Sequence, residues 1–137
     1  MAERRASTAV QVVFDTDILV WYFRSAAARR FLTGVPHASR SVSSLTVMEL
    51  IQGCRNRAEI DNLRRFLLEN IPLVLHPDEP TSRRALDLLE QHAAPHGLRV
   101  VDASIAATAL ESGATLATAN VKHYRPIRRL ELMVFRA

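Results

Sequence analysis

Residues 12–23 read VVFDTDILVWYF and join a short strand pattern to the start of a helix. The apolar residues up to Phe14 suit a buried strand, and the Asp15 side chain can then cap a helix from Thr16 to Phe23. A strand that runs straight into a helix is the repeating unit of α/β folds. The stretch therefore predicts that Asp15 lies at the carboxyl end of a parallel strand, where open α/β sheets place their ligands.

The same alternation of strand and helix patterns continues along the chain. Further extended segments are expected at residues 38–42, 73–75, 115–118 and 132–135, with a short extended approach at 99–101. Helices are expected after Ser25, Thr46, Asn56 and Asp78, from Ala103 to Glu111, and as a short turn or helix from Val121 to Tyr124. Pro95 and Gly97 are expected to stop the helix that follows Asp78. The pattern predicts an α/β fold with a central, mostly parallel sheet of four to five strands, flanked by helices on both faces.

Length and composition limit what kind of protein this can be. A chain of 137 residues with 48% hydrophobic content is enough for one domain, expected to span residues 1–137. Cys54 is the single cysteine, and the opening MAERRASTAV lacks the apolar core of a secretory signal. No apolar run approaches the roughly 20 residues that span a bilayer. We therefore expect a cytoplasmic protein with no membrane role.

The positive charge is carried almost entirely by arginine. The net charge of +4 arises from 17 arginines and one lysine against 14 acids. Many arginines form doublets: Arg4-Arg5, Arg29-Arg30, Arg64-Arg65, Arg83-Arg84 and Arg128-Arg129. The guanidinium fork matches phosphate geometry, so an anionic polymer is a reasonable partner. Solvated helix faces also use arginine, so charge alone leaves both interpretations open.

Three acidic residues lie where a helix begins or has just begun: Asp15, Glu49 and Asp102. Taken singly, each has a structural explanation, because Asp15 and Asp102 can be helix caps and Glu49 can complete a capping box with Thr46. Taken together, each lies in strongly apolar surroundings, where an uncompensated charge is costly. Asp17 adds further negative charge beside Asp15. Carboxylates gathered in this way raise one another's pKa unless a cation compensates them.

Mg²⁺ or Mn²⁺ is the natural cation for such a set of oxygens. Mg²⁺ is commonly bound through a few carboxylates and several waters beside a substrate phosphate. There it polarises a phosphoryl oxygen and lowers the pKa of a bound water. The acids therefore point to phosphodiester chemistry.

Four motifs in this order resemble the PIN-domain family, and within it the VapC-type toxins of bacterial toxin–antitoxin pairs. They are DTDILVWYF, SSLTVMELIQG, DASIAATAL and LATANVKHYRPI, and together they span nearly the whole chain. The resemblance implies a parallel sheet between helices and an Mg²⁺- or Mn²⁺-dependent endoribonuclease that hydrolyses RNA with a metal-activated water.

Carried over by position, the resemblance implies that Asp15, Glu49 and Asp102 are the acidic metal ligands. Thr118 and Asn120 fall in the motif that often supplies a further polar or acidic group. Many relatives have Asp where Asn120 stands, and Asn brings an oxygen without a charge. Asp17 stands where relatives commonly carry Asn or Ser. We therefore expect Asp15, Glu49, Asp102 and Asn120 to be catalytic, with Asp17 and Thr118 supporting them.

The resemblance also implies partners: an RNA substrate such as tRNA or ribosomal RNA, a cognate VapB-type antitoxin, and a second copy of the chain in a homodimer. A deep acidic site would attract a basic antitoxin side chain. Arg24, Arg99 and Arg125 are candidates for RNA contacts because they lie near motif ends. The five histidines are expected to have surface or packing roles, with His123 as the exception because it closely follows Asn120. Trp21 is expected to pack in the core or an interface rather than stack on a base.

Two other functions fit part of the pattern. The FDTD segment is similar to the opening motif of haloacid dehalogenase-type phosphatases, in which the first Asp attacks phosphorus. Leu19 and the absence of a convincing later Lys and paired-Asp motif speak against it. The second alternative is a module that binds RNA or a partner without cutting it, which the neutral Asn120 would suit.

Overall fold

A parallel five-stranded sheet forms the centre of the protein in the computed structural model, which describes residues 11–136. The Arg4-Arg5 doublet and the opening segment lie outside these residues. The strands are β1 (Val12–Phe14), β2 (Arg40–Ser43), β3 (Leu73–Leu75), β4 (Thr115–Thr118) and β5 (Leu132–Val134). Their order in the sheet is β3-β2-β1-β4-β5, and every neighbouring pair is parallel. The α/β prediction, with its mostly parallel sheet of four to five strands, is confirmed.

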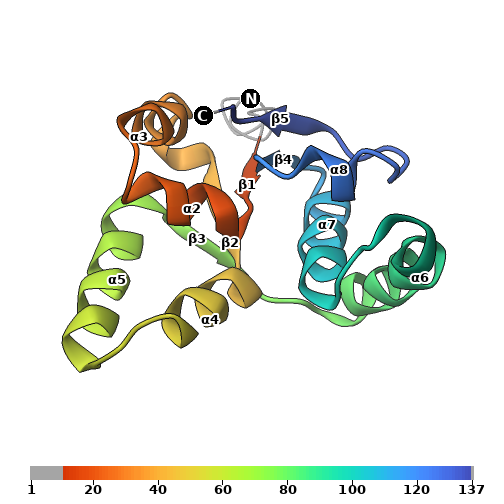
Figure 1. Ribbon diagram of the computed structural model, residues 1–137, viewed down its shortest axis with the longest axis horizontal. Helices are drawn as coiled ribbons and strands as arrows, with labels where there is room; N and C mark the ends of the chain where they lie inside the picture. Colours follow the sequence, from red (N-terminus) through yellow and green to blue (C-terminus); the bar gives the residue numbers. More distant parts are fainter. Residues whose placement is uncertain (1–10, 137) are drawn as a thin grey trace, which may run out of the picture.

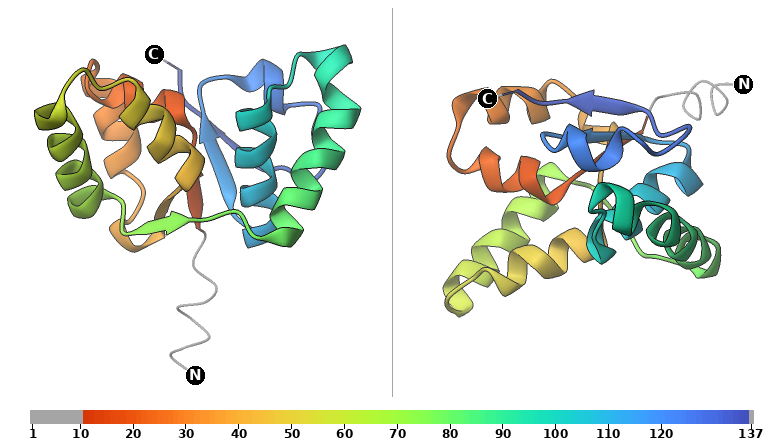
Figure 2. Two further views of the ribbon diagram at one scale, coloured as in Figure 1. Left: turned by 90° about the horizontal axis from the view of Figure 1, so that it is seen from below. Right: turned by 45° about the vertical axis from the view of Figure 1, so that its right-hand side comes forward.

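Helices cover both faces of the sheet, as Figures 1 and 2 show. The helices are α2 (Thr16–Tyr22), α3 (Ala26–Thr33), α4 (Ser44–Gln52), α5 (Arg57–Asn70), α6 (Glu79–His96), α7 (Val100–Ser112) and α8 (Val121–Tyr124). Two hydrophobic clusters divide them, with α2, α3, α4 and α5 packed in one and α6, α7 and α8 in the other. No helix within residues 11–136 is both long and apolar enough to cross a membrane.

Strand β1 belongs to both clusters because its side chains alternate between the two faces. Val12 and Phe14 pack with α2, α3 and α5, whereas Val13 packs with α7. All three side chains are buried, which explains why the strand reads as an unbroken apolar run. The chain runs outward from β1 to β2 and β3, then returns to β4 on the other side of β1. The switch in direction therefore lies between β1 and β4, where such sheets open a ligand crevice.

Several helix boundaries differ from the sequence prediction. Helix α4 begins at Ser44 with Ser43 as its cap, so Thr46 does not open it. The segment at 38–39 is part of a short 3-10 turn, and β2 begins only at Arg40. Pro95 does not stop α6, which continues to His96, whereas Gly97 ends it with a left-handed φ of 70°. A proline in the last turn removes one donor and is compatible with a helix that is about to end.

Helix α7 differs most from the prediction, because residues 99–101 are not an extended segment. The helix begins at Val100, so the β-branched pair Val100-Val101 forms its first turn. Local propensity for an extended backbone is weak and is overridden here by packing. The buried residues of α7 are Ala103, Ile105, Ala106, Ala107, Thr108 and Ala109. The four alanines among them let the helix pack closely between the sheet and α6.

Candidate functional site

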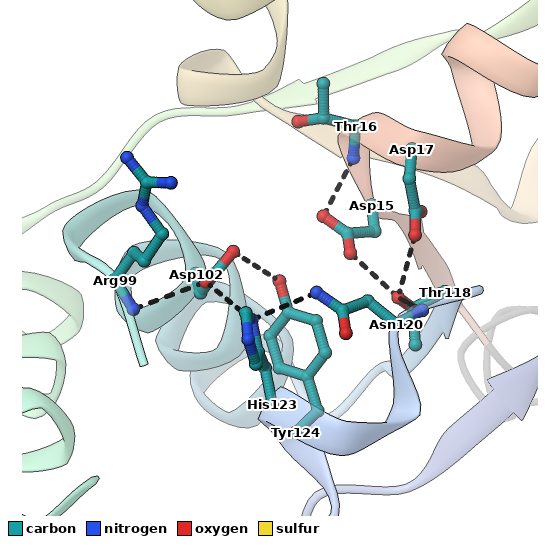
Figure 3. Close-up of polar contacts among 9 residues, drawn as sticks. All are labelled: Asp15, Thr16, Asp17, Arg99, Asp102, Thr118, Asn120, His123 and Tyr124. Carbon is teal, nitrogen blue, oxygen red and sulfur yellow. Dashed lines mark hydrogen bonds and ion pairs between the residues drawn. The ribbon is translucent and has the colours of Figure 1, made fainter. Parts of the chain in front are cut away.

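Asp15 is buried at the carboxyl end of β1 and caps α2. Only 6% of the surface of this residue is exposed to solvent. One carboxylate oxygen, Oδ1, accepts a 2.8 Å hydrogen bond from the backbone N–H of Thr16. The other, Oδ2, accepts a 2.8 Å hydrogen bond from the hydroxyl of Thr118, at the end of the adjacent strand β4 (Figure 3). The predicted cap is confirmed, and the two strand ends hold Asp15 in one orientation.

Asp17 lies in the first turn of α2 and also reaches the end of β4. Its Oδ2 accepts a hydrogen bond of 3.1 Å from the backbone N–H of Ala119. Its other oxygen, Oδ1, is buried and has no hydrogen-bond partner among the described residues. A buried carboxylate oxygen without a donor is costly, and a cation would relieve that cost.

Burial and mutual repulsion perturb the ionisation of these two acids. Burial raises the pKa of Asp15 from 3.8 to about 7, with the neighbouring Asp17 charge as the next cause and the hydrogen bonds from Thr118 and Thr16 opposing it. Burial likewise raises the pKa of Asp17. Asp102 adds a smaller repulsion to both. The pair is therefore poised to gain a positive charge, either a proton or a metal ion.

Glu49 approaches the site from the second turn of α4, not from its first turn as the capping-box interpretation required. Its Oε1 accepts a 2.6 Å hydrogen bond from the hydroxyl of Thr16. The same hydroxyl lies 3.0 Å from that of Thr46, which is fully buried. The Thr46–Glu49 spacing thus reflects two side chains of α4 that both meet Thr16. Sequence reasoning missed Thr16, although its place between Asp15 and Asp17 was visible.

Asp102 enters from the other side of the crevice, in the first turn of α7. Its Oδ2 accepts a 3.3 Å hydrogen bond from the backbone N–H of Arg99, so it caps its own helix from within. Its Oδ1 accepts a 3.2 Å hydrogen bond from the hydroxyl of Tyr124. The expectation that Asp102 follows an extended segment is therefore wrong. Its position in the first turn of α7 still brings it to the same edge of the sheet.

Helix α8 and the residue before it place three side chains near Asp102: His123 and Tyr124 from the helix and Asn120 from its N-cap position (Figure 3). The Nδ1 of His123 lies 3.3 Å from Asp102 Oδ2 and 3.0 Å from the amide nitrogen of Asn120. This nitrogen can donate to the carboxylate or accept from the amide, but not both. Tyr124 is fully buried, and its burial together with Asp15 and Asp102 raises the pKa of its hydroxyl. Tyr124 therefore remains a hydrogen-bond donor, a role that the sequence did not suggest.

One cavity of about 650 Å³ collects these groups. Its lining includes the carboxylates of Asp15, Asp17, Glu49 and Asp102, together with Thr16, Asn120 and His123. Thr118 does not line it but holds Asp15 from behind. Of the three arginines considered for RNA contacts, Arg24 and Arg99 line the cavity and Arg125 does not. Trp21 also lines it and is 39% exposed, so it is not a core residue.

The carboxylates border one space but are spread around it. Within residues 11–136, no three Asp, Glu, His or Cys side chains lie close enough together to hold a single ion directly. A hydrated cation suits this spacing, because Mg²⁺ keeps several waters and needs only one or two carboxylates. The unpartnered Asp17 oxygen and the raised pKa of Asp15 make the donor set suitable for such a cation.

The protein is thus an α/β domain with four carboxylates around the crevice at the switch point of its parallel sheet. The family model for the PIN domain matches residues 12–127. The chain belongs to the PIN domain family. The match includes every site residue described above, and it gives no support to the phosphatase alternative. No curated protein matches this chain closely enough to count as a relative.

Solved structures with the same fold include toxin–antitoxin complexes. A toxin–antitoxin complex from Klebsiella pneumoniae has a TM-score of 0.76 at 24% identity, covering 90% of this chain and 97% of that one. DNA-bound VapBC from Salmonella typhimurium has a TM-score of 0.75 at 18% identity, covering 91% and 98%. VapBC-1 from nontypeable Haemophilus influenzae has a TM-score of 0.75 at 24% identity, covering 91% and 98%. At these identities the likeness establishes the fold.

Proposed function

We propose that this PIN-domain protein is a VapC-type toxin: an Mg²⁺- or Mn²⁺-dependent endoribonuclease of a toxin–antitoxin pair. The observation that carries the proposal is the cavity in which four carboxylates from α2, α4, α7 and the end of β1 converge. A binding module would have no need to bury Asp15 beside Asp17 at the cost of a raised pKa. The toxin–antitoxin complexes among the structural neighbours support the cellular role.

Asp15 and Asp102 lie on opposite sides of the crevice and are the proposed ligands of the metal, directly or through water. When bound, Mg²⁺ or Mn²⁺ would lower the pKa of a coordinated water and neutralise charge on the phosphoryl oxygen. Thr118 and the backbone of Thr16 fix both oxygens of Asp15. Tyr124 and Arg99 fix those of Asp102. The carboxylates therefore need little rearrangement when the cation enters.

Glu49 is exposed at the mouth of the same cavity and is the proposed group that orients the attacking water. The hydrogen bond from Thr16 leaves the remaining carboxylate oxygen of Glu49 free to accept a hydrogen bond from that water. Asn120 contributes a neutral amide held near His123, so it can position substrate without adding negative charge. Asp17 adds the charge that Asn120 lacks.

The proposal is tested by RNA cleavage with purified protein and Mg²⁺. We expect wild-type protein to cut RNA, EDTA to stop the reaction, and Asp102→Asn to lower the rate by at least a hundredfold. Asp61→Asn is the matched control, because Asp61 is an exposed acid on α5 that pairs with Arg57 and lies outside the acidic cavity. Undiminished cleavage by Asp102→Asn would refute the role of Asp102. A phosphorylated Asp15 during turnover would favour the phosphatase instead.

The proposed antitoxin fits a groove that continues from the acidic cavity. A second cavity of about 720 Å³ lies between α2, α4 and α5 and shares Thr16, Val20, Arg24 and Glu49 with the first. Phe23, Leu50 and Leu63 give it an apolar floor. A helical antitoxin tail could lie there and direct a basic side chain at the acids. Co-expression with the reading frame upstream of the gene should yield a stable complex with suppressed cleavage.

The RNA target and the proposed homodimer need separate measurements. Sequencing the 5′ ends of RNAs cut after induction would identify the substrate, for which tRNA and ribosomal RNA are the proposed classes. Light scattering of the purified protein would give its mass in solution. A mass equal to one 15.3 kDa chain at all concentrations would contradict the homodimer.

A further inference from the structure

Two of the arginine doublets meet in a cavity away from the acidic site. The cavity measures about 550 Å³ and lies between α6, the end of α7 and the loop from α8 to β5. Arg83 and Arg84 come from α6, and Arg128 and Arg129 come from the loop, 44 or more residues later in the sequence. In Figure 1 this loop projects beyond α8, on the side of the molecule where α6 and α7 lie. Nothing in the proposed nuclease site uses these four residues.

The two doublets differ in how their charges are engaged. Arg83 pairs with Glu79 at 2.7 Å, and Arg84 pairs with Glu111 in the last turn of α7. Within residues 11–136, no ion pair joins Arg128 or Arg129 to a carboxylate. The cavity lining holds four arginines against two acids, Asp87 and Glu111, so it is positive overall. The loop doublet is thus the part of the cavity that is available to an anion.

Arg129 also has an unusual backbone. Its φ of 69° is the only positive φ of a non-glycine residue within residues 11–136. Buried Tyr124 and Ile127 anchor the loop on one side, through a 3.0 Å bond from Ile127 N–H to the Tyr124 carbonyl. On the other side, Leu116 N–H donates to the Glu131 carbonyl at 2.9 Å. Strain of this kind persists where the surroundings impose it, and it is common at ligand sites.

We propose that this cavity is a second RNA-contact site, which binds backbone phosphates of the substrate away from the point of cleavage. This inference rests on the proposed function. Arginine forks bind phosphate oxygens in pairs, and the lining of the cavity contains no Phe, Tyr or Trp ring for base stacking, its one aromatic ring being the imidazole of His92. Asp102 and Glu111 lie nine residues apart on α7, which corresponds to about 13 Å along the helix. A structured RNA can bridge both sites, whereas a trinucleotide bound at the acids is too short to wrap around to this cavity.

The test measures RNA binding separately from cleavage. In the Asp102→Asn background with EDTA, fluorescence anisotropy follows binding of a tRNA transcript by the full chain. We expect Arg128→Ala with Arg129→Ala to weaken binding about tenfold and to reduce the slope of log affinity against log salt by about two. Arg129→Gly removes one charge and accepts the positive φ, so it should weaken binding without lowering the melting temperature.

Arg64→Ala with Arg65→Ala is the matched control, because it removes the same charge from an exposed doublet on α5, which packs in the other hydrophobic cluster. We expect the control to stay within about twofold of the parent. Equal losses in both double variants would show a general charge effect and overturn the site, as would unchanged binding in the loop variant.

Cleavage assays with the Asp102 side chain intact separate this inference from the nuclease proposal. With Mg²⁺, the loop variant should cut a trinucleotide at the wild-type rate and the tRNA transcript more slowly. Loss of trinucleotide cleavage would overturn the proposed second site. Absence of any cleavage by wild-type protein, together with the expected binding pattern, would reject the nuclease and leave the phosphate site standing.

Discussion

At the scale of single residues, Asp15 shows how a helix cap also becomes a charged centre. One oxygen performs the structural role by accepting the Thr16 N–H, while the other faces Thr118 and lies near Asp17. The cap alone would be satisfied on the surface at low cost. Burial beside a second acid is unfavourable to folding, which is the observation that the proposed cation would explain. The two roles that the sequence left in competition are therefore compatible.

This crowding predicts a pH-dependent stability. The folded pKa of Asp15 is about 7, against 3.8 in the unfolded chain, so the folded state binds the proton more tightly between these values. Its contribution to the free energy of unfolding is therefore greatest at low pH and is lost as pH rises towards 7. In EDTA, we expect the melting temperature of wild-type protein to fall between pH 5 and about 7.5 relative to Asp15→Asn.

Thermal melts of the two proteins at matched pH provide the measurement. Mg²⁺ should reverse the effect in wild-type protein, because a cation replaces the proton at high pH. Parallel curves for the two proteins across this range would contradict the raised pKa of Asp15.

Thr16 is a residue-scale link between α2 and the acid on α4. Replacing it with Val keeps the shape but removes the hydroxyl that donates to Glu49 at 2.6 Å. We expect Thr16→Val to lower kcat about tenfold, equivalent to about 1.4 kcal/mol. Thr16→Ser should retain most activity because the donor remains. Steady-state cleavage kinetics give the comparison, and equal losses in Val and Ser variants would rule out the hydrogen bond as the cause.

At the scale of elements, the strands and the ends of helices were largely predictable, and the starts of α4 and α7 were not. Leu73–Leu75 and Thr115–Thr118 match their predicted bounds because a short apolar run between turn residues has few alternatives. Val100 and Val101 favour a strand locally, yet α7 takes them up because packing against the sheet and α6 outweighs propensity. Patterns along the chain carry no record of that packing.

The candidate site shows the same division. Asp15, Glu49, Asp102 and Asn120 all line one cavity, as the order of motifs indicated. Thr16 and Tyr124 were missed because neither residue type signals chemistry without its neighbour. From the sequence, Tyr124 is indistinguishable from an ordinary core residue. Its 3.2 Å hydrogen bond to Asp102 is what places it in the site. Contacts between distant residues therefore set the limit of what could be predicted.

Adding volume at a buried alanine of α7 should destabilise the protein, whereas the same change at an exposed alanine of α6 should not. Ala107 is fully buried, and a Leu there must displace its neighbours. We expect Ala107→Leu to lower the free energy of unfolding by about 1–3 kcal/mol. Ala93→Leu on the exposed face of α6 is the matched control and should change stability little. Urea denaturation measures both, and equal stabilities would show that α7 tolerates added volume.

At the scale of the whole molecule, an acidic centre lies within a chain of net charge +4. Under the proposed function, the arginines would attract the phosphates of RNA, and the phosphates would meet the carboxylates only at the crevice, where the proposed cation binds. Because arginine–phosphate contacts release counterions, we expect RNA affinity to fall at least about tenfold between 50 and 200 mM salt. Binding measured at several salt concentrations tests this, and a salt-independent affinity would contradict it.

The hydrogen bond between Thr118 and Asp15 joins residues 103 positions apart. During synthesis, the amino-terminal half of the sheet can emerge from the ribosome while β4 and α8 have not yet been made. Asp15 then lacks its hydroxyl donor, and Asp102 lacks Tyr124. The two acids therefore gain these donors only after residues 118–124 have been made, so a chain that stops short of them holds an incomplete site.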